Sequence, residues 1–271
     1  MRRRITSILA GLGVGLAMSG CTGSATGDSA PPTGPPPAPP DSTATTSADA
    51  AAELSGRAAT AKDLHYTAAY EWAPARREAV EITVSVALDG SWRVDVPGGA
   101  HGGRRDVTMI GNKRGVFQCE LGERRECVAV AAAGEPVPSA ADPLVQHPFT
   151  DWLDLLLDRR NPFSIAAVDA PEDVDEPGAC FSVERNAVTV AAPIPPTVYC
   201  LREDGVITWI ESSFGTLRLT GPVGEPDERT RLPGDVVDAT PLATSPPPKP
   251  TPTPDASAKS SRSPEDDDRS G

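Results

Sequence analysis

The sequence has only three histidines, and none stands in a spacing typical of a metal site or a nucleophile relay. His65 lies on the polar side of an alternating segment, His101 lies in a glycine-rich stretch, and His147 precedes a helix-like pattern. The chain also lacks the Gly-x-Ser-x-Gly elbow of hydrolases, a phosphate-binding loop and a dinucleotide fingerprint. These absences argue against an enzyme, and we expect neither a catalytic residue nor a cofactor.

Basic charge is scarce as well. The chain carries 25 Lys and Arg against 38 Asp and Glu, a formal net charge of −13. Such a chain repels the phosphates of nucleic acids and of anionic lipids, so we expect no nucleic-acid partner and no electrostatic binding to a membrane surface. The acidic run at 172–176 lacks the glycine and the ligand spacing of a calcium loop, so we interpret it as surface charge.

No apolar stretch is long enough to span a membrane. The stretch at 5–18 falls short of the roughly 20 residues that a spanning helix needs. Three arginines precede it and two small residues follow it, which predicts an export signal over 1–20. Cys21 comes directly after Ser19 and Gly20 and resembles the lipobox cysteine of bacterial lipoproteins, although Met18 replaces the usual leucine. The resemblance implies acylation of Cys21 and anchorage at the extracytoplasmic face of the cell membrane; the alternative is a secreted protein with a stray cysteine.

The other four cysteines are expected to form disulfides, because an even number in an exported domain is typical of them. Three pairings are possible. The simplest joins Cys119 to Cys127 and Cys180 to Cys200, since each pair flanks a predicted hairpin, and each bond would contribute roughly 2.5–3.5 kcal/mol. A zinc site is the alternative, but the tight CxxC spacing of such sites is missing, and we expect no metal.

Proline-rich, polar segments lie at both ends. Residues 21–47 and 222–271 contain too few large apolar side chains to order themselves, so we expect a disordered tether and a disordered acidic tail. Residues 48–221 are left as a single folded domain.

Alternating apolar and polar residues predict antiparallel strands at 64–72, 80–88 and 92–96. The turn Asp89-Gly90 lies between the last two. A three-residue loop at 89–91 would pair Val86 with Val94 and keep Arg93 off the apolar face, so we expect that register. Similar patterns predict further strands at 106–110, 115–121, 180–190, 197–202, 206–211 and 216–220.

Two segments have the helical period. Residues 48–62 are rich in alanine and place Leu54, Ala58 and Ala61 on one side. Residues 148–160 begin with proline, end before Asn161-Pro162, and carry an apolar face that includes Trp152 and Leu156. We expect this second helix to pack against the apolar face of the strands.

The element order, the first helix running into 64–72, and the closing pattern at 199–207 together resemble the half-barrel lipoprotein superfamily. This superfamily includes the lipoprotein-sorting carriers and the mycobacterial-type lipid-binding lipoproteins. The resemblance implies an α+β fold in which a strongly curved antiparallel sheet, a half-barrel, is covered on its concave face by helices.

The same resemblance implies that an amphipathic lipid-like ligand binds in an apolar pocket between the sheet and the second helix. The residues expected to line it are Tyr70, Trp72, Val84, Val86, Trp92, Phe149, Trp152 and Leu156. The alternative is that these side chains form a solid core, in which case the protein would be an anchored interaction or sensor domain without a ligand.

Overall fold

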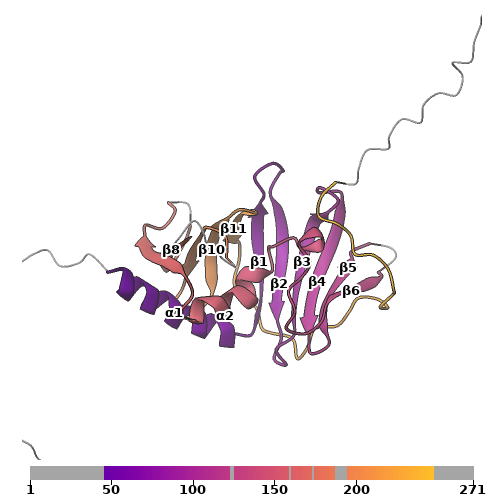
Figure 1. Cartoon of the computed structure of the whole chain (residues 1–271), viewed down its shortest axis with the longest axis horizontal. Coiled ribbons are helices and arrows are strands. Elements are labelled where there is room, and N and C mark those ends of the chain that lie inside the picture. Colours follow the sequence, from indigo (N-terminus) through magenta and orange to yellow (C-terminus); the bar gives the residue numbers. More distant parts are fainter. Residues whose placement is uncertain (1–45, 123–124, 159, 173, 187–193, 247–271) are drawn as a thin grey trace, which may run out of the picture. The chain divides into compact units, whose positions relative to one another are not determined.

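The computed structural model describes residues 46–122, 125–158, 160–172, 174–186 and 194–246. The predicted export signal, Cys21 and the tail after 246 lie outside these residues. Within them, eleven strands form one antiparallel sheet in the order β6-β5-β4-β3-β2-β1-β11-β10-β9-β8-β7 (Figure 1). The strands are β1 (Tyr66–Ala73), β2 (Val80–Val86), β3 (Trp92–Ala100), β4 (Arg105–Asn112), β5 (Gly115–Glu120), β6 (Cys127–Ala131), β7 (Phe163–Val168), β8 (Ala179–Arg185), β9 (Thr197–Leu201), β10 (Ile207–Ser212) and β11 (Gly215–Leu219).

The expected α+β half-barrel is wrong. The sheet is neither closed nor strongly curled, and the described residues hold only two α-helices, α1 (Ser47–Asp63) and α2 (Asp151–Leu157), besides two short 3₁₀ turns, η1 (Ser139–Ala141) and η2 (His147–Phe149). Eleven strands side by side span about 48 Å. The longer helix is only about 25 Å long, so two helices are too few to cover the sheet. The architecture is therefore mostly β.

The first helix agrees with the alanine-rich pattern. Thr46 caps α1, because its side chain accepts a hydrogen bond from the Asp49 amide while the Asp49 carboxylate accepts one from the Thr46 hydroxyl. The predicted apolar side of α1, with Leu54 and Ala58, is fully buried. It packs in one cluster with the sheet face that carries Tyr70 and Val84, which we call the front face.

The second helix is shorter than expected. The segment 148–160 divides into η2 and α2, because Thr150 between them has φ −132° and ψ −112°, outside the helical range. Asn161 donates a side-chain hydrogen bond to the Leu155 carbonyl, 2.6 Å away, which occupies an oxygen near the end of the helix. The apolar face of α2 nevertheless joins the front-face core, as predicted.

The register between β2 and β3 differs from the prediction by two residues. Val86 pairs with Trp92 and Val84 with Val94, so the loop is 87–91 rather than 89–91. A shift of two preserves the faces, and Arg93 stays off the front face as expected. The wider loop is held by hydrogen bonds to a segment far away in the sequence, which the local pattern could not predict. The backbone amides of Leu88 and Asp89 donate to the carbonyls of residues 227 and 228.

Both predicted disulfides are present. Cys119 is bonded to Cys127 across β5 and β6, and Cys180 to Cys200 across β8 and β9. In each case the two cysteines are direct cross-strand partners on the back face of the sheet. Each bond therefore fixes the register of its strand pair near one end of the sheet.

Residues 222–246, which we assigned to the disordered tail, are packed against the sheet and differ from that expectation. We call them the strap. Gly224 bridges to Thr67, Leu232 packs on the back-face disulfide of Cys119, and Val236 pairs with the outer strand β6. Leu242 then exchanges hydrogen bonds with Gln118 on the front face. The strap thus passes around the β6 edge of the sheet, where Figure 1 shows it in yellow and orange.

Candidate functional site

The eight predicted lining residues lie together in a single core cluster on the front face. Six of them are at most 5 % exposed: Tyr70, Trp72, Val84, Phe149, Trp152 and Leu156. They contact one another, with the rings of Tyr70 and Phe149 centred 4.9 Å apart. The Tyr70 hydroxyl and the Trp72 indole each donate to a backbone carbonyl, at 2.9 and 3.0 Å. The space between α2 and the inner strands is therefore filled by these side chains.

An open groove lies beside this filled core. It has a volume of about 500 Å³ and runs between the end of α1, the ends of β2, β3 and β5, and the segment that carries η2 and α2. We call it the Trp92 groove. Its apolar lining is Val86, Trp92, Val116, Pro136, Val137, Phe149 and Leu153; its polar lining is Lys62, His65, Glu135, Gln146, His147, Thr150, Asp151 and Asp154. Three of the predicted lining residues, Val86, Trp92 and Phe149, thus border this groove.

The shape of the groove depends on how Trp92 is placed at the start of β3. Gly111 is its partner on β4, and a Cβ atom at 111 would overlap the indole ring. Glycine at this position lets the ring lie flat across the neighbouring strand. Phe149 approaches from η2, so the two aromatic side chains reach the groove from opposite walls.

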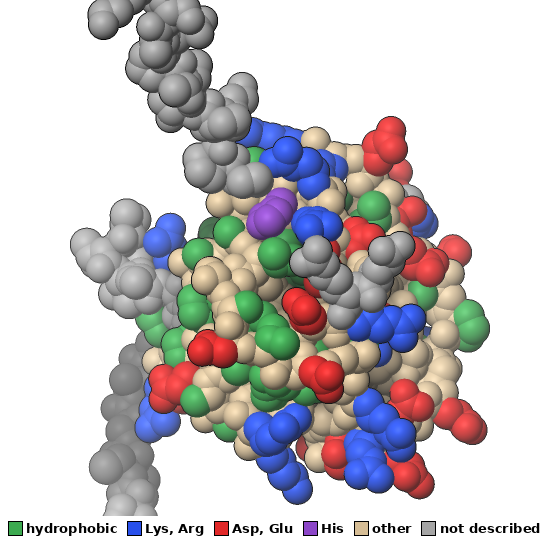
Figure 2. All heavy atoms as spheres, turned by 90° about the vertical axis from the view of Figure 1, so that its right-hand side faces the viewer, with side chains coloured by type: hydrophobic (Ala, Val, Ile, Leu, Met, Phe, Trp, Pro, Cys, Tyr) green, Lys and Arg blue, Asp and Glu red, His purple; other side chains and the backbone are tan. Residues whose placement is uncertain are grey.

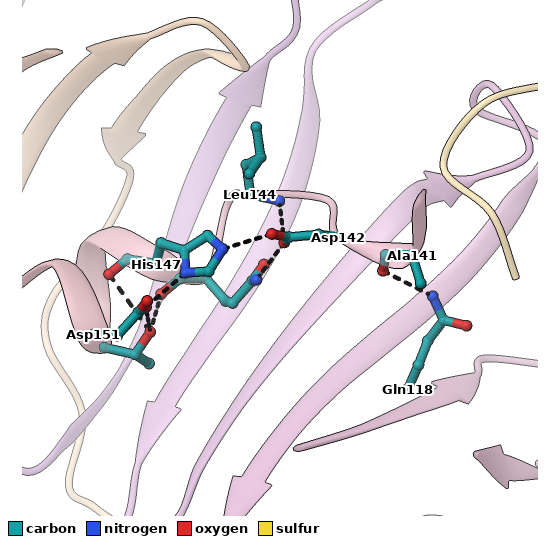
Figure 3. Close-up of polar contacts among 8 residues, drawn as sticks. Gln118, Ala141, Asp142, Leu144, His147 and Asp151 are labelled. Atoms are coloured by element: carbon teal, nitrogen blue, oxygen red, sulfur yellow. Dashed lines mark hydrogen bonds and ion pairs between the residues drawn. The ribbon is translucent and has the colours of Figure 1, made fainter. Parts of the chain in front are cut away.

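A charged cluster holds one wall of the groove. His147 donates through Nε2 to Asp142, at 2.8 Å, and through Nδ1 to Asp151, at 2.6 Å (Figure 3). Carboxylates only accept, so both ring nitrogens carry hydrogen and His147 is an imidazolium. Burial alone would lower the pKa of His147, but the bonds to the two carboxylates outweigh it and raise the pKa to about 9. Burial would likewise raise the pKa of Asp151, and its bond to His147 lowers it instead.

This cluster is a clamp rather than a proton-transfer site. Both nitrogens of His147 are occupied, and its ring is stacked on Trp152 at 5.4 Å with an interplanar angle of 11°. A general base needs a free nitrogen aimed at a substrate proton, which this arrangement does not offer. Instead, the clamp joins the loop before η2 to the start of α2 and so fixes the Phe149 wall of the groove.

The clamp was missed by the sequence reasoning, which gave His147 no partner. A signal was present, because His147 and Asp151 are four residues apart and share one side of a helical turn. Asp142 could not have been found this way, since it lies in an irregular segment whose path depends on tertiary contacts. Gln118 supports that segment by donating to the Ala141 carbonyl, at 3.3 Å (Figure 3).

A second hollow, of about 570 Å³, lies on the other side of the clamp and shares His147 and Asp151 with the groove. Arg185 and Ile194 border it, and these residues flank 187–193, which the structure does not describe. We therefore take the Trp92 groove, and not this second hollow, as the candidate functional site.

Other kinds of site find no support in the described part of the chain. It contains no group of three or more His, Cys, Asp or Glu side chains that could hold a metal ion. Its helices are all too short or too polar to cross a membrane. The end of the molecule shown in Figure 2 has hydrophobic side chains scattered among acidic and basic ones, without a continuous apolar patch on its visible surface.

Comparison with known proteins gives no family for this chain: it matches no protein-family model and no curated protein.

Proposed function

We propose that this protein is a membrane-anchored extracytoplasmic protein that binds an amphipathic, lipid-like ligand in the Trp92 groove. The observation that supports it is the mixed lining of the groove, with aromatic and aliphatic side chains on its walls and charged groups at its rim. Its volume of about 500 Å³ lies within the range of small-molecule sites. The ligand would lie along the surface of the domain, because the interior is filled.

The two parts of such a ligand have separate partners. An apolar chain would contact Trp92, Phe149 and Val86, and each buried methylene would contribute about 0.8 kcal/mol. A polar head would meet the exposed ion pair of Lys62 with Asp154. Binding needs no proton transfer, which agrees with a clamp whose histidine is fully engaged.

The membrane anchor is part of the proposal and rests on the lipobox resemblance of Cys21. Acyl chains on Cys21 would hold the protein beside a supply of amphiphiles despite its net charge of −13. Replacing Cys21 by serine should release the protein from the membrane fraction, as followed by fractionation and by the mass of the N-terminal peptide. A Cys21→Ser protein that stays in the membrane fraction with an unchanged N-terminal mass would contradict anchorage through this residue.

The ligand proposal is tested by native mass spectrometry of the protein purified from its own membranes. We expect bound amphiphile on the wild-type chain and its loss from Trp92→Ala. Trp209→Phe is the matched control, because Trp209 lies on the back face in β10 and outside the groove. Wild-type protein free of ligand, or Trp92→Ala with its ligand retained, would overturn the proposal.

A second candidate is an anchored protein-interaction or sensor domain. The packed core favours it, because the rings of Tyr70 and Phe149, like those of Trp152 and Phe214, pack against each other in one core cluster where an acyl chain would otherwise lie. Cross-linking in intact cells would then give a stable protein partner, and the purified protein would carry no small ligand.

A further inference from the structure

We infer that Gln146 is the specificity-determining residue of the Trp92 groove and that it selects ligands whose head donates a hydrogen bond. The inference rests on the proposed function, whose ligand it narrows to an uncharged head with an N–H or O–H group. It begins with unpaired polar atoms. Five buried side-chain atoms in the described residues have no partner, and two of them, Gln146 Oε1 and His65 Nδ1, belong to residues that line this groove.

Gln146 is only 1 % exposed, and its orientation is fixed. Its Nε2 donates to Asp142 Oδ1 at 2.7 Å, and a carboxylate cannot donate in return. The amide oxygen is therefore the end that is left over, and it can only accept.

The clamp prevents the amide from turning over. Asp142 accepts from His147, from the Leu144 amide at 3.0 Å and from Gln146, so its carboxylate is held from three sides. If the amide of Gln146 were turned over, its oxygen would face that carboxylate and the bond would be lost. Asp142 and His147 thus act as positioning residues for Gln146.

The charges around the groove narrow the class of head group. Glu135, Asp151 and Asp154 line the groove together with Lys62 and His147, and both of these cations are already paired with carboxylates. An anionic head would meet an acceptor oxygen and carboxylates without a free cation. A neutral head that donates N–H or O–H fits both the oxygen and the rim.

The oxygen is buried in the free protein, and its residue lines the groove. When the ligand binds, side chains around Gln146 must move to give its head access to the oxygen. The hydrogen bond between the head and this oxygen then forms without competition from water. An unpaired buried acceptor is unfavourable, so the free protein gains nothing from Gln146 at this point. The oxygen of Gln146 gains its hydrogen-bond partner only when the ligand binds.

The test uses two probes with the same acyl chain, titrated against the full chain by isothermal calorimetry: octanamide, which donates N–H, and N,N-dimethyloctanamide, in which two methyl groups replace both donor hydrogens. We expect the wild type to bind octanamide roughly tenfold more tightly, the worth of one well-formed hydrogen bond. Gln146→Met should bind the two amides equally. Gln118→Met is the matched control, because Gln118 is also buried but its amide is fully bonded outside the groove, and it should keep the wild-type ratio.

A second readout needs no variant. The side-chain NH₂ resonances of Gln146 should shift with octanamide and stay in place with the dimethyl probe, while those of Gln118 should not move with either. Equal binding of both probes by the wild type, with Trp92→Ala abolishing it, would overturn the role of Gln146 and leave the groove intact as a site. Failure of both probes to bind would count against the proposed function itself.

Discussion

The two halves of the front face are covered in different ways. Over β1 and β7–β11, apolar side chains of the helices α1 and α2 pack against fully buried side chains of the sheet, such as Phe181 and Tyr199. Over β2–β6 the cover is irregular instead. It consists of the segment between β6 and α2 and of the end of the strap. Hydrogen bonds from Gln118 and from the His147 clamp hold these segments in place. The core beneath the helices is filled and the second hollow opens at its edge, whereas the Trp92 groove lies where the irregular cover begins. The comparison teaches that packed helices fill the space over a sheet with side chains, whereas backbone held through polar contacts leaves the Trp92 groove open.

The largest effect is expected in the helical half. Phe181→Ala removes a ring that is 0 % exposed beneath the helices, and we expect a loss of about 3–5 kcal/mol in the free energy of unfolding. Urea denaturation followed by circular dichroism measures it. Val168→Ala, at a side chain that is 37 % exposed on the outer strand β7, is the control and should change stability by about 0.5 kcal/mol or less. A small loss for Phe181→Ala would mean that this half is not held by packing.

The disulfides allow a direct comparison, since one lies in each half. Replacing Cys180 and Cys200 by alanine should cost about 3.3 kcal/mol, and replacing Cys119 and Cys127 about 2.5 kcal/mol, because the loops close over 20 and 8 residues. Urea midpoints of the oxidised double variants give both values. A larger loss for Cys119 and Cys127 would indicate that this bond also holds the strap, which packs on it through Leu232.

The His147 clamp should make the irregular half sensitive to alkaline pH. Its pKa is raised from 6.5 to about 9, so the folded state holds the proton more tightly than the unfolded chain. The resulting stability is fully present below about pH 6.5 and is lost as the pH rises through about 9, with a loss of at most about 3 kcal/mol. Urea titrations from pH 6 to pH 10 measure the slope.

The control for this pH dependence is His147→Gln, which should be less stable at neutral pH and should lack most of the slope. Burial raises the pKa of Tyr66 from 10.0 to about 12, so this phenol lowers the stability only as the pH reaches 10, at the upper end of the titration. An equal slope in the variant would assign the effect to other groups.

The smallest effect is expected at the rim of the groove. Lys62 and Asp154 are both roughly half exposed, so solvent screens their ion pair. Lys62→Ala should change the free energy of unfolding by about 0.5 kcal/mol or less, and less still in high salt. Thermal denaturation at low and high salt checks it; a loss above 1 kcal/mol would show that the rim contributes to the cover of the sheet.

Much of the secondary structure could be predicted, because each element depends on local periodicity. The apolar side of α1, the alternation in β1–β3 and the two disulfide pairs follow from spacing along the chain. The half-barrel was wrong because curvature and cover are properties of the whole sheet. The β2–β3 loop was misplaced because the strap, distant in sequence, occupies its backbone groups.

The candidate site shows the same division. Val86, Trp92 and Phe149 were predicted because their apolar character and period place them on the front face. Gln146 and Asp142 were not, since nothing in their neighbourhood marks them; their roles arise from hydrogen bonds with each other and with His147.

The sequence by itself determined which residues face the core, where α1 starts and which cysteine pairing is the simplest, since these depend on periods of two and 3.6 residues and on short spacings. Only the tertiary structure decided that the sheet stays open, that the strap closes the β6 edge, and that a groove remains beside a filled core. The physical reason is that these features depend on contacts between segments far apart in the chain, where volume and hydrogen-bond partners are matched only after folding.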